Sequence, residues 1–133
     1  MSVPYITKVK NIHLGAIAID SDALLYALWK VDHAIKVTAV RLGVNTSCAA
    51  ADTNYNTFYV KNGTVVISTI ANGPVAGGTS FVLGTMSACV VTTAAEANLV
   101  AAGDTLSFKV TKTGNGLALA GACLQIEYLE YQA

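Results

Sequence analysis

Short runs rich in β-branched and aromatic residues, separated by Gly and Asn, limit the fold of this chain more than any other feature. The clearest example is AAGDTLSFKVTKTGNGLALAGACLQIEYLEY, which spans Ala101–Tyr131. Apolar residues occupy alternate positions on both sides of a turn at 113–116: Leu106, Phe108, Val110, Leu124, Ile126 and Tyr128. Such alternation is typical of a strand with one buried face. We therefore predict a hairpin of half-buried strands in this stretch.

Two further segments predict a β-bulge and a hairpin turn at defined positions. In the run 35–44 the apolar face slips by one residue near Ala39, which predicts a β-bulge. The dipeptide Asn62-Gly63 lies between β-rich runs and predicts a hairpin turn, because both residues tolerate positive φ. These signals indicate where strands bend or reverse.

Other segments carry weaker signals. The segment 21–31 has leucines at helical spacing between strand-like flanks, and we predict a strand there rather than a helix. SFVLGTMSACVV at 80–91 is a further β-prone run, and a short helical turn is expected at Ala94–Asn98. About eight strands joined by turns, with little helix, favour a β-sandwich or a β-barrel. At 133 residues and without a linker, the chain is expected to form a single domain, 1–133.

The chain carries little charge. Charged residues make up 12% of the sequence and hydrophobic residues 53%, and eight Lys and Arg balance eight Asp and Glu. There is no basic stripe, so we expect neither nucleic acid nor an anionic membrane as a partner. The apolar runs are shorter than the roughly 18 residues that indicate a membrane-spanning helix, and the N-terminus lacks the apolar stretch of a signal peptide. Zero net charge instead favours association of copies.

The turn at 113–116 contains fragments of two functional motifs. Gly114 and Gly116 match the start of G-x-G-x-x-G, but the third position is Leu119, and a strand-like run follows in place of a helix. The K-T-G at 112–114 matches a motif of serine β-lactamases, but the S-x-x-K and S-D-N motifs that must accompany it do not occur. We interpret both matches as parts of a structural turn.

Histidines and cysteines do not form a recognisable site. The chain has only His13 and His33, and its cysteines Cys48, Cys89 and Cys123 are far apart, without a C-x-x-C pair. No G-x-S-x-G nucleophile elbow and no calcium-loop pattern occurs. We therefore expect no enzymatic activity, no metal and no cofactor.

Aromatic side chains offer an alternative function. Carbohydrates bind on aromatic platforms, and the candidates for such stacking are Trp29, Tyr55, Tyr59 and Tyr131. Most tyrosines of a β-sandwich instead pack with the hydroxyl at the rim. Carbohydrate binding is therefore kept as the alternative to a structural role.

Two stretches carry a resemblance to a known family. In VAAGDTLSFKVTKTGNGLALAGACLQIEY, a G-D dipeptide precedes an amphipathic strand, a T-G-x-G-x-A-L turn and a final strand. In VDHAIKVTAVRLGV and AADTNYNTFYVKNG, two strand patterns follow one another. Together they resemble small jelly-roll proteins from the virions of tailed bacteriophages, over about 25–128, with a departure at Ala120, where a proline would be expected. The resemblance implies an all-β, antiparallel jelly-roll β-sandwich of about eight strands.

The same resemblance implies a role. Members of such families decorate or cement capsids, or form head fibres and tail parts. We accordingly expect a non-enzymatic capsid decoration or cement protein on the capsid surface of the virion, assembled in the cytoplasm of the host bacterium, with the major capsid protein as its partner. A head-fibre or tail module that binds a receptor or a carbohydrate is the alternative. We also expect a homo-oligomer, with a trimer favoured over a dimer.

The two ends of the chain are the predicted contact surface. Strict alternation places Leu129 and Tyr131 on the outer face of the last strand and turns Glu130 inward. Pro4 suits a strand edge or an arm, and we assign residues 1–8 to an N-terminal arm. The predicted interface residues are Val3, Pro4, Tyr5, Ile6, Leu129 and Tyr131. The alternative is that both ends pack along the sandwich's own edge.

Overall fold

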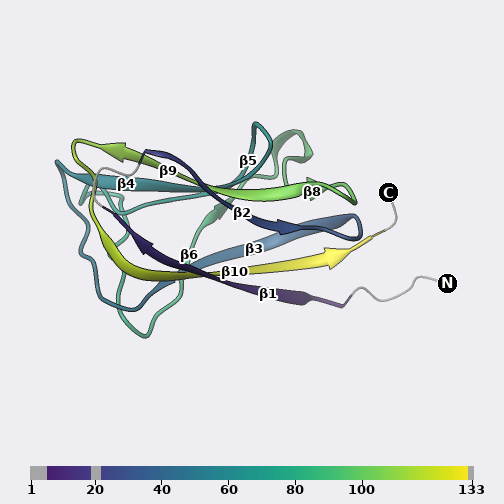
Figure 1. Ribbon diagram of the computed structural model, residues 1–133, viewed down its shortest axis with the longest axis horizontal. Coiled ribbons are helices and arrows are strands. Elements are labelled where there is room, and N and C mark those ends of the chain that lie inside the picture. Colours follow the sequence, from purple (N-terminus) through teal and green to yellow (C-terminus); the bar gives the residue numbers. More distant parts are fainter. Residues whose placement is uncertain (1–5, 19–21, 132–133) are drawn as a thin grey trace.

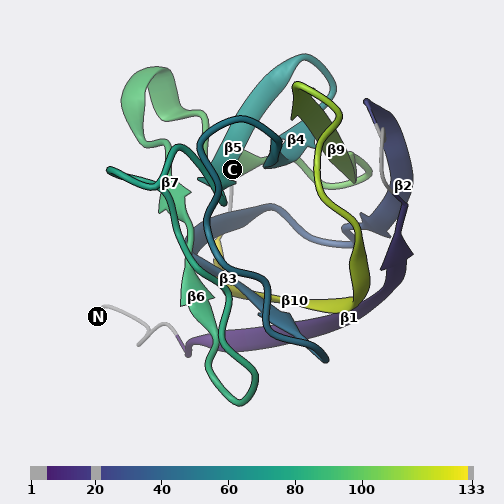
Figure 2. The same ribbon diagram turned by 90° about the vertical axis from the view of Figure 1, so that its left-hand side faces the viewer.

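The computed structural model describes residues 6–18 and 22–131, which form ten β-strands in two antiparallel sheets (Figure 1). Sheet A contains, in spatial order, β1 (Lys8–Ile17), β10 (Leu119–Glu130), β3 (Ile35–Val44) and β6 (Ser87–Ala88), with β8 (Leu99–Val100) also paired to β3. Sheet B contains β2 (Ala23–Lys30), β9 (Thr105–Thr113), β4 (Tyr55–Asn62), β5 (Val65–Ala71) and β7 (Val90–Val91). Seen end-on, the sheets face each other as a sandwich (Figure 2).

The strand order is that of a jelly roll. The first strand pairs with the last, β2 pairs with β9, β3 pairs with β6, and β4 pairs with β5. The chain is therefore one long antiparallel ribbon that is wound into two sheets, the arrangement of a double-sheet jelly roll. The predicted all-β jelly-roll sandwich is confirmed, and so is the choice of strand over helix at 21–31, where β2 forms.

The core lies between the sheets and consists of the side chains that point inward from the strands. Phe108 of β9 stacks on Phe58 of β4 with ring centroids 5.9 Å apart, and the Phe81 ring packs against Phe58 at a tilt with the same centroid distance of 5.9 Å. The predicted core residues are all buried: Leu106, Phe108, Val110, Leu124 and Ile126. Alternation in these two strands therefore identified the inner face correctly.

The predicted hairpin at 113–116 is wrong in its pairing. The chain does reverse there, but β9 pairs with β2 and β4 in sheet B, whereas β10 pairs with β1 and β3 in sheet A. The turn therefore crosses from one sheet to the other. Gly114 and Gly116 adopt positive φ, +63° and +68°, and a Cβ at Gly116 would collide with Oδ1 of Asn56. Both glycines are needed because this crossing packs closely on the start of β4.

Two predicted irregularities can be compared with the structure. The β-bulge near Ala39 is confirmed, because Val37 pairs with Tyr128 and Ala39 with Glu127, which leaves one extra residue on β3. The hairpin after β4 is also present, but Asn62 stays in the strand opposite Val65, and the loop is 63–64 with Gly63 at φ +60°. The expected short helical turn is a 3-10 turn at Ala94–Glu96.

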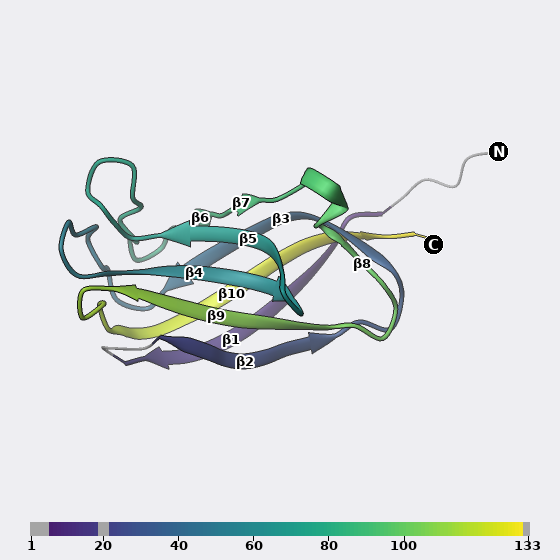
Figure 3. The ribbon, with the colours of Figure 1, turned by 90° about the horizontal axis from the view of Figure 1, so that it is seen from above.

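The β-prone run 80–91 is mostly not a strand. Gly84 adopts φ +87°, and the Thr85 N–H donates to the Val82 carbonyl at 3.0 Å, so a turn interrupts the run. Beyond it, β6 pairs with β3 in sheet A and β7 pairs with β5 in sheet B. Residues 87–91 thus cross between the sheets along one long side of the molecule, opposite the side formed by β1 and β2 (Figure 3).

Candidate interaction surface at the open end

The start of the first strand and the end of the last strand lie side by side. Lys8 of β1 is opposite Tyr128 of β10, so the described start of the chain lies beside the end of β10 at one end of the sandwich. We call this the open end, and it consists of residues 6–10, 29–35 and 128–131.

The individual interface residues differ in how far they are exposed. Val3, Pro4 and Tyr5 lie outside the described residues. Ile6 is 73% exposed, whereas Leu129 and Tyr131 are half-buried. The last strand continues to Glu130, and the Tyr131 N–H donates to the Ala34 carbonyl at 3.0 Å. The end of β10 therefore packs partly on its own chain and keeps part of Leu129 and Tyr131 accessible.

An ion pair joins the two terminal segments. The Lys8 ammonium lies 2.9 Å from Oε1 of Glu130, and both side chains are partly exposed. The hydrogen bond that Lys8 donates to Glu130, together with the negative charge of Glu130, raises the pKa of Lys8, and the same hydrogen bond lowers the pKa of Glu130. The pair holds the beginning of β1 against the end of β10.

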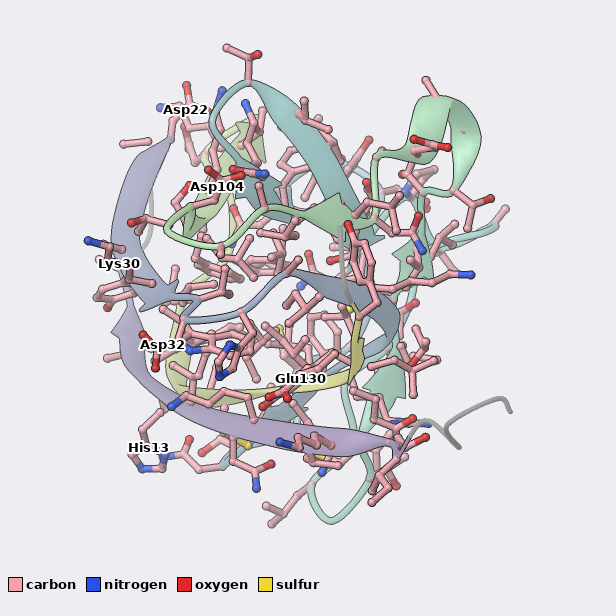
Figure 4. The ribbon with its side chains drawn as sticks, turned by 90° about the vertical axis from the view of Figure 1, so that its right-hand side faces the viewer. His13, Asp22, Lys30, Asp32, Asp104 and Glu130 are labelled. Carbon is pink, nitrogen blue, oxygen red and sulfur yellow. The ribbon has the colours of Figure 1, made fainter. Side chains whose placement is uncertain are left out.

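A pocket of about 210 Å³ opens between the sheets at this end. Its lining residues come from β1, β2, the segment between β2 and β3, the first residue of β3, and β10: Lys10, Trp29, Asp32, His33, Ile35, Tyr128 and Glu130. Figure 4 looks onto this end and shows Asp32 toward the left and Glu130 in the lower centre. The predicted inward orientation of Glu130 agrees with its place in the lining. The pocket combines aromatic rings with charged groups of both signs.

The aromatic part of the pocket is a pair of rings. Trp29 of sheet B and Tyr128 of sheet A have centroids 4.9 Å apart with an interplanar angle of 55°. The Lys10 ammonium lies 5.5 Å from the centre of the Trp29 ring, within the range of a cation–π contact. The sequence analysis named Trp29 but not Tyr128 or Lys10. Alternation along β10 and β1 turns both of these side chains inward and could have indicated them.

The other predicted aromatic platforms do not join this pocket. Tyr55 and Tyr59 lie on β4, and neither they nor Tyr131 line it. Cys48, Cys89 and Cys123 are free thiols. Burial raises the pKa of Cys89 to about 12. Across 6–18 and 22–131, no group of three His, Cys, Asp or Glu side chains is arranged to hold a metal ion.

A second exposed surface lies at the opposite end, which we call the loop end. Val82, Leu83 and Met86 are exposed on the loop before β6, and Leu83 is 60% exposed. The loop is braced, because the Leu83 N–H donates to Oγ of Ser47 at 2.9 Å. Sequence reasoning missed this apolar surface because it read the run as strand, and the signal against that reading was Gly84.

Searches against protein-family models, curated protein sequences and solved structures found no match. Within the described residues, no helix is both long and apolar enough to span a membrane.

Proposed function

We propose that this chain is a non-enzymatic structural protein of a bacteriophage virion, a decoration or cement protein that binds the outside of the capsid and stabilises it. The observation that carries the proposal is the presence of large apolar side chains, well exposed, at both ends of a charge-poor sandwich. They include Ile6 and Val9 at the open end and Val75, Val82, Leu83 and Met86 on the loops of the loop end. Exposed apolar groups that gather on one surface mark sites of protein contact.

The physical basis is burial of apolar surface at many equivalent positions. Each Å² of apolar surface that a contact removes from water contributes about 25 cal/mol, part of which offsets the cost of immobilising the protein. Many copies on one shell act together, so no single contact has to be strong. With eight Lys and Arg against eight Asp and Glu, neighbouring copies also repel one another little.

In this role the chain has two partners. The loop 82–86 contacts the major capsid protein, and the terminal segments 3–6 and 129–131 contact sister copies or the capsid surface. Sister copies form a homo-oligomer, with a trimer favoured over a dimer. The protein then resides on the capsid surface after assembly in the bacterial cytoplasm.

The test is co-assembly with a shell. The chain is co-expressed with the major capsid protein of the genome that encodes it, and the purified shells are assayed for bound copies and for their temperature of disruption. We expect stoichiometric binding and a higher disruption temperature. Leu83→Ser should reduce binding, whereas Val65→Ser, the same change from an exposed apolar side chain to serine on the β4–β5 hairpin, should not. Shells that never retain the folded protein contradict the proposal.

Terminal deletions separate the two partners. Removing 1–6 or 129–133 should lower the oligomeric state, measured by size-exclusion chromatography with light scattering, while circular dichroism verifies the β-sheet content. If the shortened chains fold, oligomerise and bind shells like the full chain, the terminal segments play no part in assembly.

A further inference from the structure

The inward-facing residues change from apolar to charged at the open end. On β1 the inner face carries Leu14 and Ile12 and then Lys10, and on β10 it carries Ile126 and then Glu130 beyond Tyr128. The alternation itself is unbroken, so these charged side chains occupy positions that belong to the core elsewhere. A charge that is fully buried without compensation is costly. The sheets therefore do not close over these residues, and a solvated pocket remains.

The charges in and beside this pocket balance. Lys10 and Lys8 supply ammonium groups, Asp32 and Glu130 supply carboxylates, and His33 adds an imidazole. An anionic ligand would meet the carboxylates, and a cationic ligand would have to compete with the ammonium groups of the chain itself. A neutral ligand with many hydroxyls avoids both conflicts, since hydroxyls donate to carboxylates and accept from ammonium groups.

The size and the aromatic rings narrow the ligand class further. The pocket, at about 210 Å³, is smaller than the roughly 300–1,000 Å³ of sites for drug-sized ligands, so it limits the ligand to about one ring. Trp29 and Tyr128 form a small aromatic wall, the Lys10 ammonium lies over the Trp29 ring, and the rest of the accessible lining is mostly polar. A sugar ring has both required surfaces, because its C–H groups form an apolar face while its hydroxyls point outward.

We propose that the pocket between Trp29, Tyr128, Asp32 and Glu130 binds a single neutral sugar unit, such as the terminal residue of a glycan. The sugar's apolar face packs on the aromatic wall. Asp32 and Glu130 accept hydrogen bonds from its hydroxyls, and Lys10 donates to a ring or hydroxyl oxygen. This site is separate from the proposed capsid contact at the loop 82–86, which is at the opposite end of the sandwich, and it lies beside the terminal segment 129–131.

The chain contains a built-in probe for this site. Trp29 is the only tryptophan, so intrinsic tryptophan fluorescence reports on the pocket alone. The full chain is titrated with neutral methyl glycosides of hexoses and N-acetylhexosamines, and with a charged set of sialic acid and glucosamine. We expect a saturable change in Trp29 emission, in the millimolar range, with at least one neutral glycoside and a weaker response to the charged sugars.

Variants decide between binding in the pocket and a nonspecific response. Asp32→Asn and Glu130→Gln keep the side-chain shapes but remove a charged acceptor, and each should weaken binding about tenfold. Lys109→Met, a change of charge on β9 outside the pocket, should leave binding unchanged. Backbone amide shifts in NMR spectra must map to the open end. No response to any neutral glycoside, equal weakening by Lys109→Met, or stronger binding of a charged sugar would each overturn the proposal.

Discussion

The two ends of the sandwich handle buried polarity in different ways. At the loop end, the inward polar side chains are the neutral amides Asn56 and Asn72, and both are fully buried. The Asn56 N–H donates to Oδ1 of Asn72 at 2.8 Å, and the Asn72 N–H donates to the Asn56 carbonyl at 3.1 Å. At the open end the inward polar side chains are charged, as Lys10 and Glu130 show, and they stay partly in solvent.

This difference follows from the cost of removing each group from water. An amide that finds hydrogen-bond partners can be buried at little cost, so the loop end is sealed. A charge is much harder to bury, so the open end keeps a pocket. In the loop end, Oδ1 of Asn56 is the one buried side-chain oxygen or nitrogen of the described residues that lacks a partner. The seal is therefore close to complete.

The largest effect is expected in the core that both ends share. Phe108→Ala should lower the free energy of unfolding by about 3–5 kcal/mol, because it removes a ring that stacks on Phe58 and leaves a cavity. Urea denaturation measures the loss. Ser107→Ala, on the outward side of the same strand, is the control and should change stability by less than about 0.5 kcal/mol. Equal losses in the two variants would show that the inner face of β9 is assigned incorrectly.

A smaller loss is expected where the loop end packs most closely. Gly116→Ala and Gly63→Ala both force a side chain into positive φ, +68° and +60°, which costs about 1–2 kcal/mol in each case. Only at Gly116 would the new Cβ also meet Oδ1 of Asn56, whereas Gly63 has open space around it. Chemical denaturation should therefore show a clearly larger loss for Gly116→Ala. Identical losses would mean that the crossing at 113–116 does not press on β4.

The contrast between amide and charge can be tested by the same replacement at both ends. Asn56→Leu should cost about 1–3 kcal/mol, because it leaves the Leu117 carbonyl without its side-chain donor, whereas the bonds to Asn72 use the backbone of Asn56 and are kept. Lys10→Leu should change stability by less than about 1 kcal/mol, since a lost cation–π contact is offset by added apolar burial. Thermal unfolding of both variants provides the measurement. A larger loss for Lys10→Leu would reverse the assignment of sealed and open ends.

The smallest effect concerns the ion pair at the open end. Because Lys8 lowers the pKa of Glu130, ionised Glu130 stabilises the fold above the usual glutamate pKa, and this contribution is lost as the pH falls through the lowered value. Because Glu130 raises the pKa of Lys8, the contribution is also lost as the pH rises through that raised value. Glu130→Gln should therefore lower the Tm slightly at neutral pH and not at all in strong acid. High salt should shrink the difference, and a difference that persists in acid would point to a cause other than the charge.

Much of the fold could be predicted because alternation shows which side of a strand is buried. The slip near Ala39 and the inward phase of Phe108 and Ile126 are properties of a few consecutive residues, and they were predicted correctly. Pairing partners are not local, because the alternation of β9 and β10 reads the same whether the chain between them forms a hairpin or crosses to the other sheet. This is why the turn at 113–116 was assigned to a hairpin.

The candidate site was harder to predict for a related reason. Its lining residues Lys10, Trp29 and Tyr128 come from three strands that the sequence separates widely. Trp29 was named as an aromatic platform, and Glu130 was expected to turn inward, but nothing local indicates that they meet. At the loop end, the residues around Leu83 are apolar and β-prone, and only the positive φ of Gly84 takes them out of a strand.

The crossing at 87–91 has a mechanical consequence. Since β6 belongs to sheet A and β7 to sheet B, this segment acts as a spine that joins the sheets along one long side. In the described chain, no strand pairing joins β1 of sheet A to β2 of sheet B. Thermal fluctuations should therefore separate the two sheets first along the side that these strands form. Cys89 sits within the spine, its N–H donates to the Val40 carbonyl at 2.8 Å, and burial raises the pKa of its thiol to about 12. Because the thiolate is the reactive form, alkylation of Cys89 should therefore be the slowest of the cysteines.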